Sequence, residues 1–103
     1  MQAFTALADP TRRHIVELLA EREYAAGDLG ERFALSQPAV SQHLRVLRDA
    51  GLVRVRRDAQ RRMYALEPRG LEEMDAWLSR YRHFWSRHLT ALERALTAEK
   101  DAS

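Results

Sequence analysis

The stretch from Ser36 to Gly51 constrains the fold most strongly, because it contains a helix start, an apolar stripe and a helix stop. Val40, Leu44 and Leu47 recur at spacings of four and three residues, so they share one face of a helix. The serine is a favourable N-cap, and the glycine is suited to a left-handed C-cap. These signals together predict one amphipathic helix whose apolar face points into a core.

The other face of this helix carries side chains that form hydrogen bonds, rather than the mixture of glutamate and lysine that usually covers an idle surface. Glutamine and arginine can pair bidentately with base edges in the major groove of DNA. The same pattern also fits an ordinary amphipathic helix with polar outer residues, so this stretch alone leaves both interpretations open. The outward residues are Gln37, Ser41, Gln42, Arg45 and Arg48.

The chain has 103 residues, and we expect residues 1–103 to form a single domain. It contains no cysteine, which excludes disulfides and thiolate metal ligands and fits a reducing cytosol. The first residues are too few and too weakly charged to form a signal peptide, and no apolar run approaches the roughly 20 residues that span a bilayer. We therefore expect a cytoplasmic protein without a membrane partner.

Positive charge is concentrated in the middle third of the sequence. Residues 36–66 hold seven arginines against two aspartates, whereas the segments before and after them are slightly acidic. The formal net charge of the whole chain is only +2. A local basic region on a nearly neutral protein predicts a docking surface for a polyanion.

Short helices are expected before the central one. One lies near residues 3–8, and the Asp-Pro pair at 9–10 is a strong start signal for a second. A third is expected over 26–33, and a three-residue turn joins it to the helix at 36–50. Two short helices joined in this way form the helix-turn-helix pattern, although Ala34 stands where the turn usually has glycine.

After the central helix the apolar residues begin to alternate, which predicts two strands over residues 53–66. We call this hairpin the wing. The link at 58–60 lacks glycine, so a tight two-residue connection is not expected. The predicted fold class is mainly α with a small two-stranded β-hairpin and about five helices. The arginines near the tip of the wing are Arg56, Arg57, Arg61 and Arg62.

The last element is expected to be one helix over residues 68–98, roughly 45 Å long at 1.5 Å per residue. Its apolar residues recur at spacings of three and four and include several aromatic rings. A chain of this size cannot cover so long an apolar stripe by itself, which favours self-association. The alternative is a core helix packed against the first helix. The stripe includes Leu78, Tyr81, Trp85 and Leu92.

Two stretches, LADPTRRHIVELL at 7–19 and LSQPAVSQHLRVLRDAGLV at 35–53, resemble the ArsR-type winged-helix repressors. The resemblance covers roughly residues 3–66. The segment WLSRYRHFW at 77–85 is similar to a branch of that family without metal sites. The resemblance implies a homodimeric bacterial repressor of the winged helix-turn-helix fold. Helices at 1–8 and 68–98 would form the dimer, with Phe4 and Leu7 joining the stripe of the last helix.

The resemblance also assigns the contacts with double-stranded DNA. Among the central-helix positions we rank Gln37, Ser41, Gln42 and Arg45 as base readers. Ser36 and His43 are better suited to phosphate contacts or to supporting the helix, and His43 borders the buried face. The wing arginines would meet phosphates or the minor groove, contacts that give affinity and salt dependence rather than sequence choice. The full set is Ser36, Gln37, Ser41, Gln42, His43, Arg45, Arg56, Arg57, Arg61 and Arg62.

The sensor sites of the family do not transfer to this sequence. The stretch at 23–29 lacks the cysteine that metal-sensing members carry. His83 and His88 are five residues apart, about 140° around a helix, so they do not share a face. We expect no metal, no cofactor and no catalytic residues. Two alternatives share the fold: a regulator released from DNA by an inducer or metal, and a protein-interaction module that does not bind DNA.

Overall fold

The computed structural model describes residues 2–102, and the side chains of residues 2–99. Six helices and three strands make up this part of the chain. The predicted class, mainly helical with a small β-hairpin, is confirmed. The elements in order are α1 (Gln2–Leu7), α2 (Pro10–Glu21), β1 (Tyr24–Ala25), α3 (Ala26–Phe33), α4 (Gln37–Asp49), β2 (Val53–Asp58), β3 (Arg61–Leu66), α5 (Pro68–Ser79) and α6 (Arg82–Ala102).

The helix starts follow the predicted caps. Asp9 accepts a hydrogen bond at 2.9 Å from the backbone amide of Arg12, at the start of α2. The hydroxyl of Ser36 accepts one at 3.3 Å from the amide of Ala39, at the start of α4. These bonds satisfy amides that have no partner within the helix. Gly51, after the end of α4, has the predicted left-handed conformation, with a φ of 72°.

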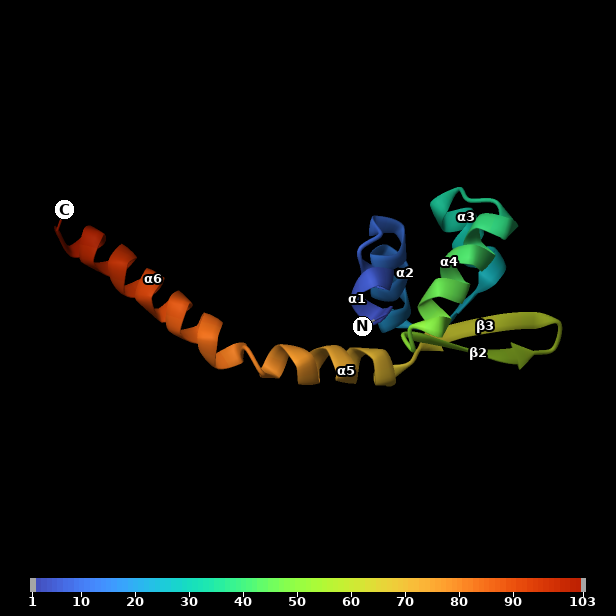
Figure 1. The fold of residues 1–103 in the computed structure, drawn as a ribbon. Helices are drawn as coiled ribbons and strands as arrows, with labels where there is room; N and C mark the ends of the chain where they lie inside the picture. Colours follow the sequence, from blue (N-terminus) through green and yellow to red (C-terminus); the bar gives the residue numbers. More distant parts are fainter. Residues whose placement is uncertain (1, 103) are drawn as a thin grey trace.

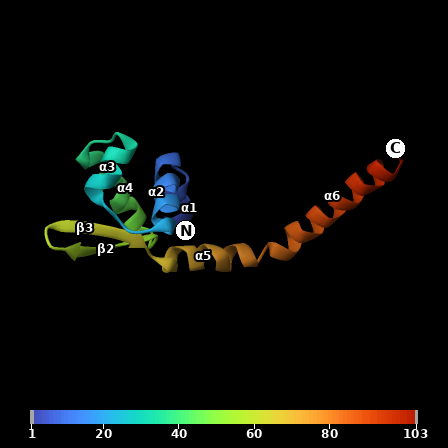
Figure 2. The ribbon, with the colours of Figure 1, turned by 180° about the vertical axis from the view of Figure 1, so that it is seen from behind.

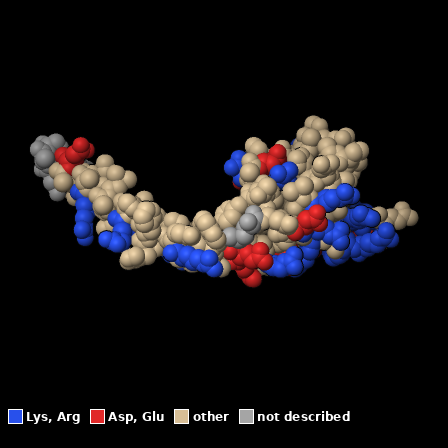
Figure 3. Space-filling view, in the orientation of Figure 1, with Lys and Arg blue, Asp and Glu red and all other residues tan. Residues whose placement is uncertain are grey.

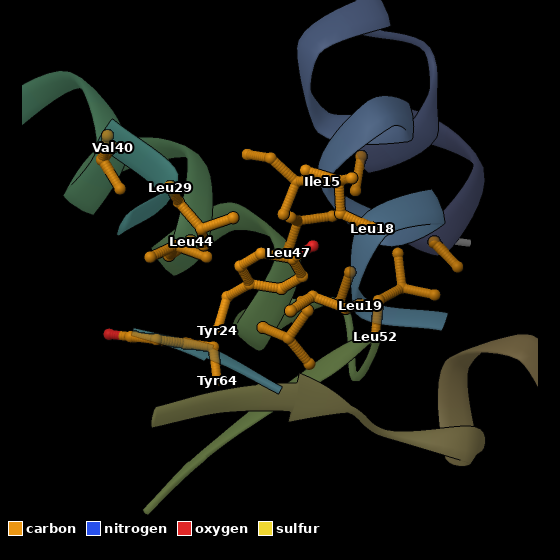
Figure 4. Close-up of a cluster of buried hydrophobic side chains, with 14 residues drawn as sticks. Ile15, Leu18, Leu19, Tyr24, Leu29, Val40, Leu44, Leu47, Leu52 and Tyr64 are labelled. Carbon is orange, nitrogen blue, oxygen red and sulfur yellow. The ribbon is translucent and has the colours of Figure 1, made fainter. Parts of the chain in front are cut away.

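The core lies between the helices and the sheet. Figure 4 shows side chains from α2, α3, α4 and the strands meeting there, Tyr24 and Tyr64 among them. Ile15, Leu29 and Leu47 are fully buried. Burial of this apolar surface is the main force that holds α4 against the rest of the domain.

The sheet has one more strand than the sequence predicted. β1 pairs with β3, which also pairs with β2, in the antiparallel order β1-β3-β2. β1 contains only two residues, so it has no alternation that a sequence pattern could reveal. The expectation for the hairpin link was also wrong. Asp58 pairs directly with Arg61, so two residues connect the strands, and Ala59 takes the positive φ of 58° that this requires.

The single helix predicted over 68–98 is in fact two helices, α5 and α6. The amides of Arg80 and Tyr81 bond to carbonyls three residues back, and regular helix then resumes after Tyr81. Neither proline nor glycine marks the break. In Figure 1, α5 runs below the other helices and α6 projects away from them. We call α6 the arm, and Figure 2 shows it from behind. The molecule is accordingly elongated, at 65 × 29 × 20 Å.

A close backbone contact fixes the start of α5 against the end of α4. The amide of Gly70 donates to the carbonyl oxygen of Gly51 at 2.8 Å. A Cβ atom at Gly70 would lie only 2.8 Å from the carbonyl oxygens of Ala50 and Gly51, so no larger residue fits there without a shift. This contact ties the direction of α5 to that of α4.

The turn between α3 and α4 contains a strained residue whose replacement should change the free energy of unfolding. Ala34 adopts a left-handed conformation, with φ 54° and ψ 41°, which places its Cβ too close to the backbone. We expect Ala34→Gly to raise the free energy of unfolding by about 1 kcal/mol, measured by urea denaturation. The same change at Ala76, in regular helix, should lower it by about 1 kcal/mol. Destabilisation by both substitutions would contradict the proposed strain at Ala34.

Candidate nucleic-acid interface

Packing of α4 determines which of its residues face solvent. Val40, Leu44 and Leu47 are no more than 2% exposed, as the apolar spacing predicted. The residues on the opposite side of the helix therefore point outward, because a helix turns by about 100° per residue. Ser41, Gln42, Arg45 and Arg48 are all exposed. One face of α4 thus presents hydroxyl, amide and guanidinium groups to solvent.

Gln37 and Ser36, two of the predicted DNA contacts, differ from these residues in their surroundings. The amide of Gln37 lies over α3, so close that a Cβ atom at Gly30 would come within 2.7 Å of its Nε2. The glycine thus leaves room for this side chain. Ser36 is exposed, but its hydroxyl is already the acceptor of the α4 cap.

His43 is half-buried and packs against the start of α2. Its Nδ1 lies 3.4 Å from Nη1 of Arg12 and 4.0 Å from Oδ2 of Asp9. The backbone hydrogen bond from Arg12 is the main reason that the pKa of Asp9 lies below its usual value, with the charges of Arg12 and His43 adding to it. This arrangement corresponds to the supporting role that the sequence allowed for His43.

The wing arginines differ in their surroundings. Arg56 binds the carboxylate of Glu23 with Nη2 at 2.7 Å and Nε at 3.1 Å from Oε2. This hydrogen bond is the chief cause of a lowered pKa at Glu23 and a raised pKa at Arg56. Arg61 binds Oδ2 of Asp28 at 3.0 Å. Neither carboxylate was predicted from the sequence to be part of this surface.

Arg57 occupies a different position from its neighbour in the chain. It lies directly opposite Arg62 in the hairpin, and both side chains are exposed. Neither forms an ion pair with any residue between 2 and 99. Figure 3 shows arginine side chains gathered over the wing and along the lower edge of the molecule in that view. The predicted DNA-contact residues of α4 and the wing therefore belong to neighbouring elements, but they do not form one uniform basic patch.

The arm carries a large uncovered apolar surface. Of its described side chains, Trp85 alone is half-buried, and the others are exposed. Phe84 is 64% exposed, and Leu92 is 56% exposed. Tyr81, just before the arm, is 45% exposed and packs against Trp77 at a ring distance of 4.9 Å. The predicted interface residues at the other end, Phe4 and Leu7, are half-buried in α1, and Phe4 touches the ring of Trp77.

Within residues 2–99, no three histidine or acidic side chains come together in a way that could hold a metal ion. His83 and His88 both lie on the exposed arm, where His88 contacts the ring of Phe84. The helices that the structure describes are too short or too polar to cross a bilayer.

Comparison with known proteins places this geometry among regulators of transcription. A family model described as "Bacterial regulatory protein, arsR family" matches residues 9–55. The chain is 46% identical over 100 residues to the HTH-type transcriptional regulator Rv2034 of Mycobacterium tuberculosis, covering 97% of this chain and 91% of that protein. It is 37% identical over 75 residues to the transcriptional repressor SdpR of Bacillus subtilis, covering 73% and 83%.

A solved structure supports the same conclusion about the fold. It is described as a possible transcriptional regulator for arsenical resistance, and it aligns with a TM-score of 0.73 and 38% sequence identity. The alignment covers 87% of this chain and 95% of that one. The winged helix-turn-helix expected from the sequence is thereby confirmed.

Two adjacent α4 residues should differ in their effect on stability. His43 contacts α2, whereas Gln42 is exposed. We expect His43→Ala to lower the free energy of unfolding by about 1 kcal/mol, and Gln42→Ala to change it by less than about 0.5 kcal/mol. Urea denaturation at neutral pH measures both values. Equal losses would mean that His43 does not support the helix.

Proposed function

This chain belongs to the arsR family of bacterial regulatory proteins, and we propose that it represses transcription as a homodimer bound to an inverted-repeat operator. Family membership makes it a DNA-binding transcriptional regulator and not an enzyme. The observation that carries the proposal is the orientation of α4, whose apolar stripe is buried and whose hydrogen-bonding face is exposed. A helix presented in this way fits the major groove of a duplex.

Within this proposal, α4 recognises the base sequence of the operator and the wing adds affinity for DNA. Gln42 and Arg45 are the strongest candidates for base contacts, because both are exposed and both side chains can form paired hydrogen bonds with bases. Ser41 lies beside them and can contact a base or a phosphate. Gln37 is nearer to α3, and Ser36 and His43 support the helix from its ends and its border.

The homodimer is proposed from the apolar surface of α5 and α6. A second copy of the chain can cover the exposed rings and leucines that this molecule leaves in solvent. Tyr81, Trp85 and Leu92 would form the centre of that contact, with Leu78 beside them and Phe4 and Leu7 contributed by α1. A two-fold dimer would then place its α4 helices about 34–36 Å apart, one turn of DNA.

Repression in this proposal needs neither a metal nor a cofactor. The bound dimer would occupy an operator and exclude RNA polymerase from it. The site of action would be the cytoplasm, where bacterial DNA is transcribed. A mobility-shift assay on the DNA upstream of the protein's own gene tests the proposal. We expect a retarded complex at low salt, and failure to bind that DNA or any inverted repeat would contradict it.

Gln42→Ala should reduce the preference of the protein for its operator over random DNA. Losing one paired base contact costs about 1–3 kcal/mol of binding free energy on the operator and leaves binding to random DNA nearly unchanged. Fluorescence anisotropy with both duplexes measures the ratio of the two affinities. Arg57→Ala serves as the comparison, because loss of a phosphate contact should weaken binding to both duplexes alike. Equal losses for Gln42→Ala on the two duplexes would show that Gln42 does not read a base.

Trp85→Ala should weaken the dimer. Buried tryptophans often dominate the energy of an interface, so we expect the dissociation constant to rise at least about tenfold in sedimentation equilibrium. Arg87→Ala is the matched control, because Arg87 lies two residues further along α6 on the opposite side and is exposed. A Trp85→Ala protein with an unchanged dimer would exclude Trp85 from the interface.

A further inference from the structure

We infer that the arginines of the wing have two different roles, and that the register of its strands determines which arginine has which role. Arg57 and Arg62 bind phosphates of the DNA backbone beside α4. Their chain neighbours Arg56 and Arg61 are positioning residues that hold the wing to the rest of the protein. These roles presuppose that the chain binds DNA as proposed above, and they define which wing side chains touch it.

The register places Arg57 and Arg62 on the face of the wing that turns toward α4. Residues directly opposite each other in an antiparallel pair lie on the same face of the sheet, and alternate residues along a strand share that face. Arg57 is opposite Arg62, and two residues further into the sheet Val55 is opposite Tyr64. Tyr64 belongs to the core. The two arginines therefore extend the core-facing side of the sheet beyond its buried part.

The arginines on the other face are each paired with a carboxylate. Arg56 makes its two-nitrogen contact with Glu23, next to β1, and Arg61 binds Asp28 in the first turn of α3. Arg54, on the same face, lies 3.7 Å from the carboxylate that follows β3. Each pair joins the hairpin to a segment outside it. The positive charge on this face is thus largely neutralised, and its side chains restrain the wing.

A groove lies between α4 and β3 on the side of Arg62. Its volume is about 470 Å³, and three guanidinium groups face one carboxylate along its walls. Within the described part of the chain, none of these three arginines forms an ion pair. Guanidinium groups bind phosphate oxygens through two parallel hydrogen bonds, so a phosphodiester is the group that fits this chemistry. The polar residues lining the groove are Ser41, Arg45, Arg48, Asp49, Arg62 and Tyr64.

A phosphate in this groove would be held by the helix and the wing together. Phosphate contacts carry no sequence information, but they set the register and orientation of a protein on the duplex. A backbone phosphate fixed between Arg48 and Arg62 would therefore set how α4 enters the major groove and leave Arg45 free to contact a base. Arg57 lies across the hairpin from Arg62 and would bind a neighbouring phosphate.

Salt dependence separates the two roles. The plot of log affinity against log salt has a negative slope, and each phosphate contact that is lost makes it less steep by about 0.9. In a homodimer with two altered wings the reduction is about 1.8. Arg61→Ala and Arg62→Ala remove the same charge one residue apart. Fluorescence anisotropy on a random-sequence duplex over a salt series should show the reduced slope for Arg62→Ala and the wild-type slope for Arg61→Ala.

A charge reversal tests the positioning role. Arg56→Glu places two carboxylates side by side and should weaken binding to the same duplex. Adding Glu23→Arg restores an ion pair of opposite sense, so the double variant should recover the affinity and salt slope of the wild type. A phosphate contact at Arg56 would instead leave the double variant as weak as the single one. Circular dichroism melting confirms that each variant is folded.

The outcomes also separate this inference from the proposal on which it rests. A wild-type protein without salt-dependent binding to the duplex would contradict DNA binding itself. A wild-type protein that binds, together with equal slope losses for Arg61→Ala and Arg62→Ala, would overturn only the division of roles in the wing.

Discussion

Burial of the apolar side of α4 fixes which side chains this helix presents to solvent. Val40, Leu44 and Leu47 are held in the core by α2, α3 and the sheet, so the helix cannot rotate without exposing them. That constraint fixes the direction in which Gln42 and Arg45 point, without any contact on the exposed face of the helix. In the proposed complex with DNA, sequence recognition would therefore depend on core packing, because the same helix supplies both faces.

Further contacts fix the parts of the molecule that would position α4 on DNA. The hydrogen bond between Gly70 and Gly51 ties the end of α4 to α5, and through α5 to the apolar arm. The ion pairs of Arg56 and Arg61 tie the wing to the residue before β1 and to α3. A dimer formed by the arm would therefore set the distance between two α4 helices, and the wing would sit at a fixed place beside each.

Local signals in the sequence predicted the parts of the fold that depend on neighbours in the chain. The caps and apolar spacing of α4, the short helix at 26–33 and the strands of the wing are of this kind. The break near Tyr81 was missed because no proline or glycine marks it, and the tight turn was missed because Ala59 takes a conformation that favours glycine. The ion pairs of the wing join residues 33 positions apart, so no spacing in the sequence could reveal them.

Dimethyl sulfate protection of operator DNA reports whether α4 enters the major groove. The reagent methylates guanine at N7, which lies in the major groove, and adenine at N3, which lies in the minor groove. We expect two clusters of protected guanine N7 atoms, related by the symmetry of an inverted repeat and about one helical turn or a multiple of it apart. Protection of adenine N3 alone, with every guanine N7 in the bound region still reactive, would contradict it.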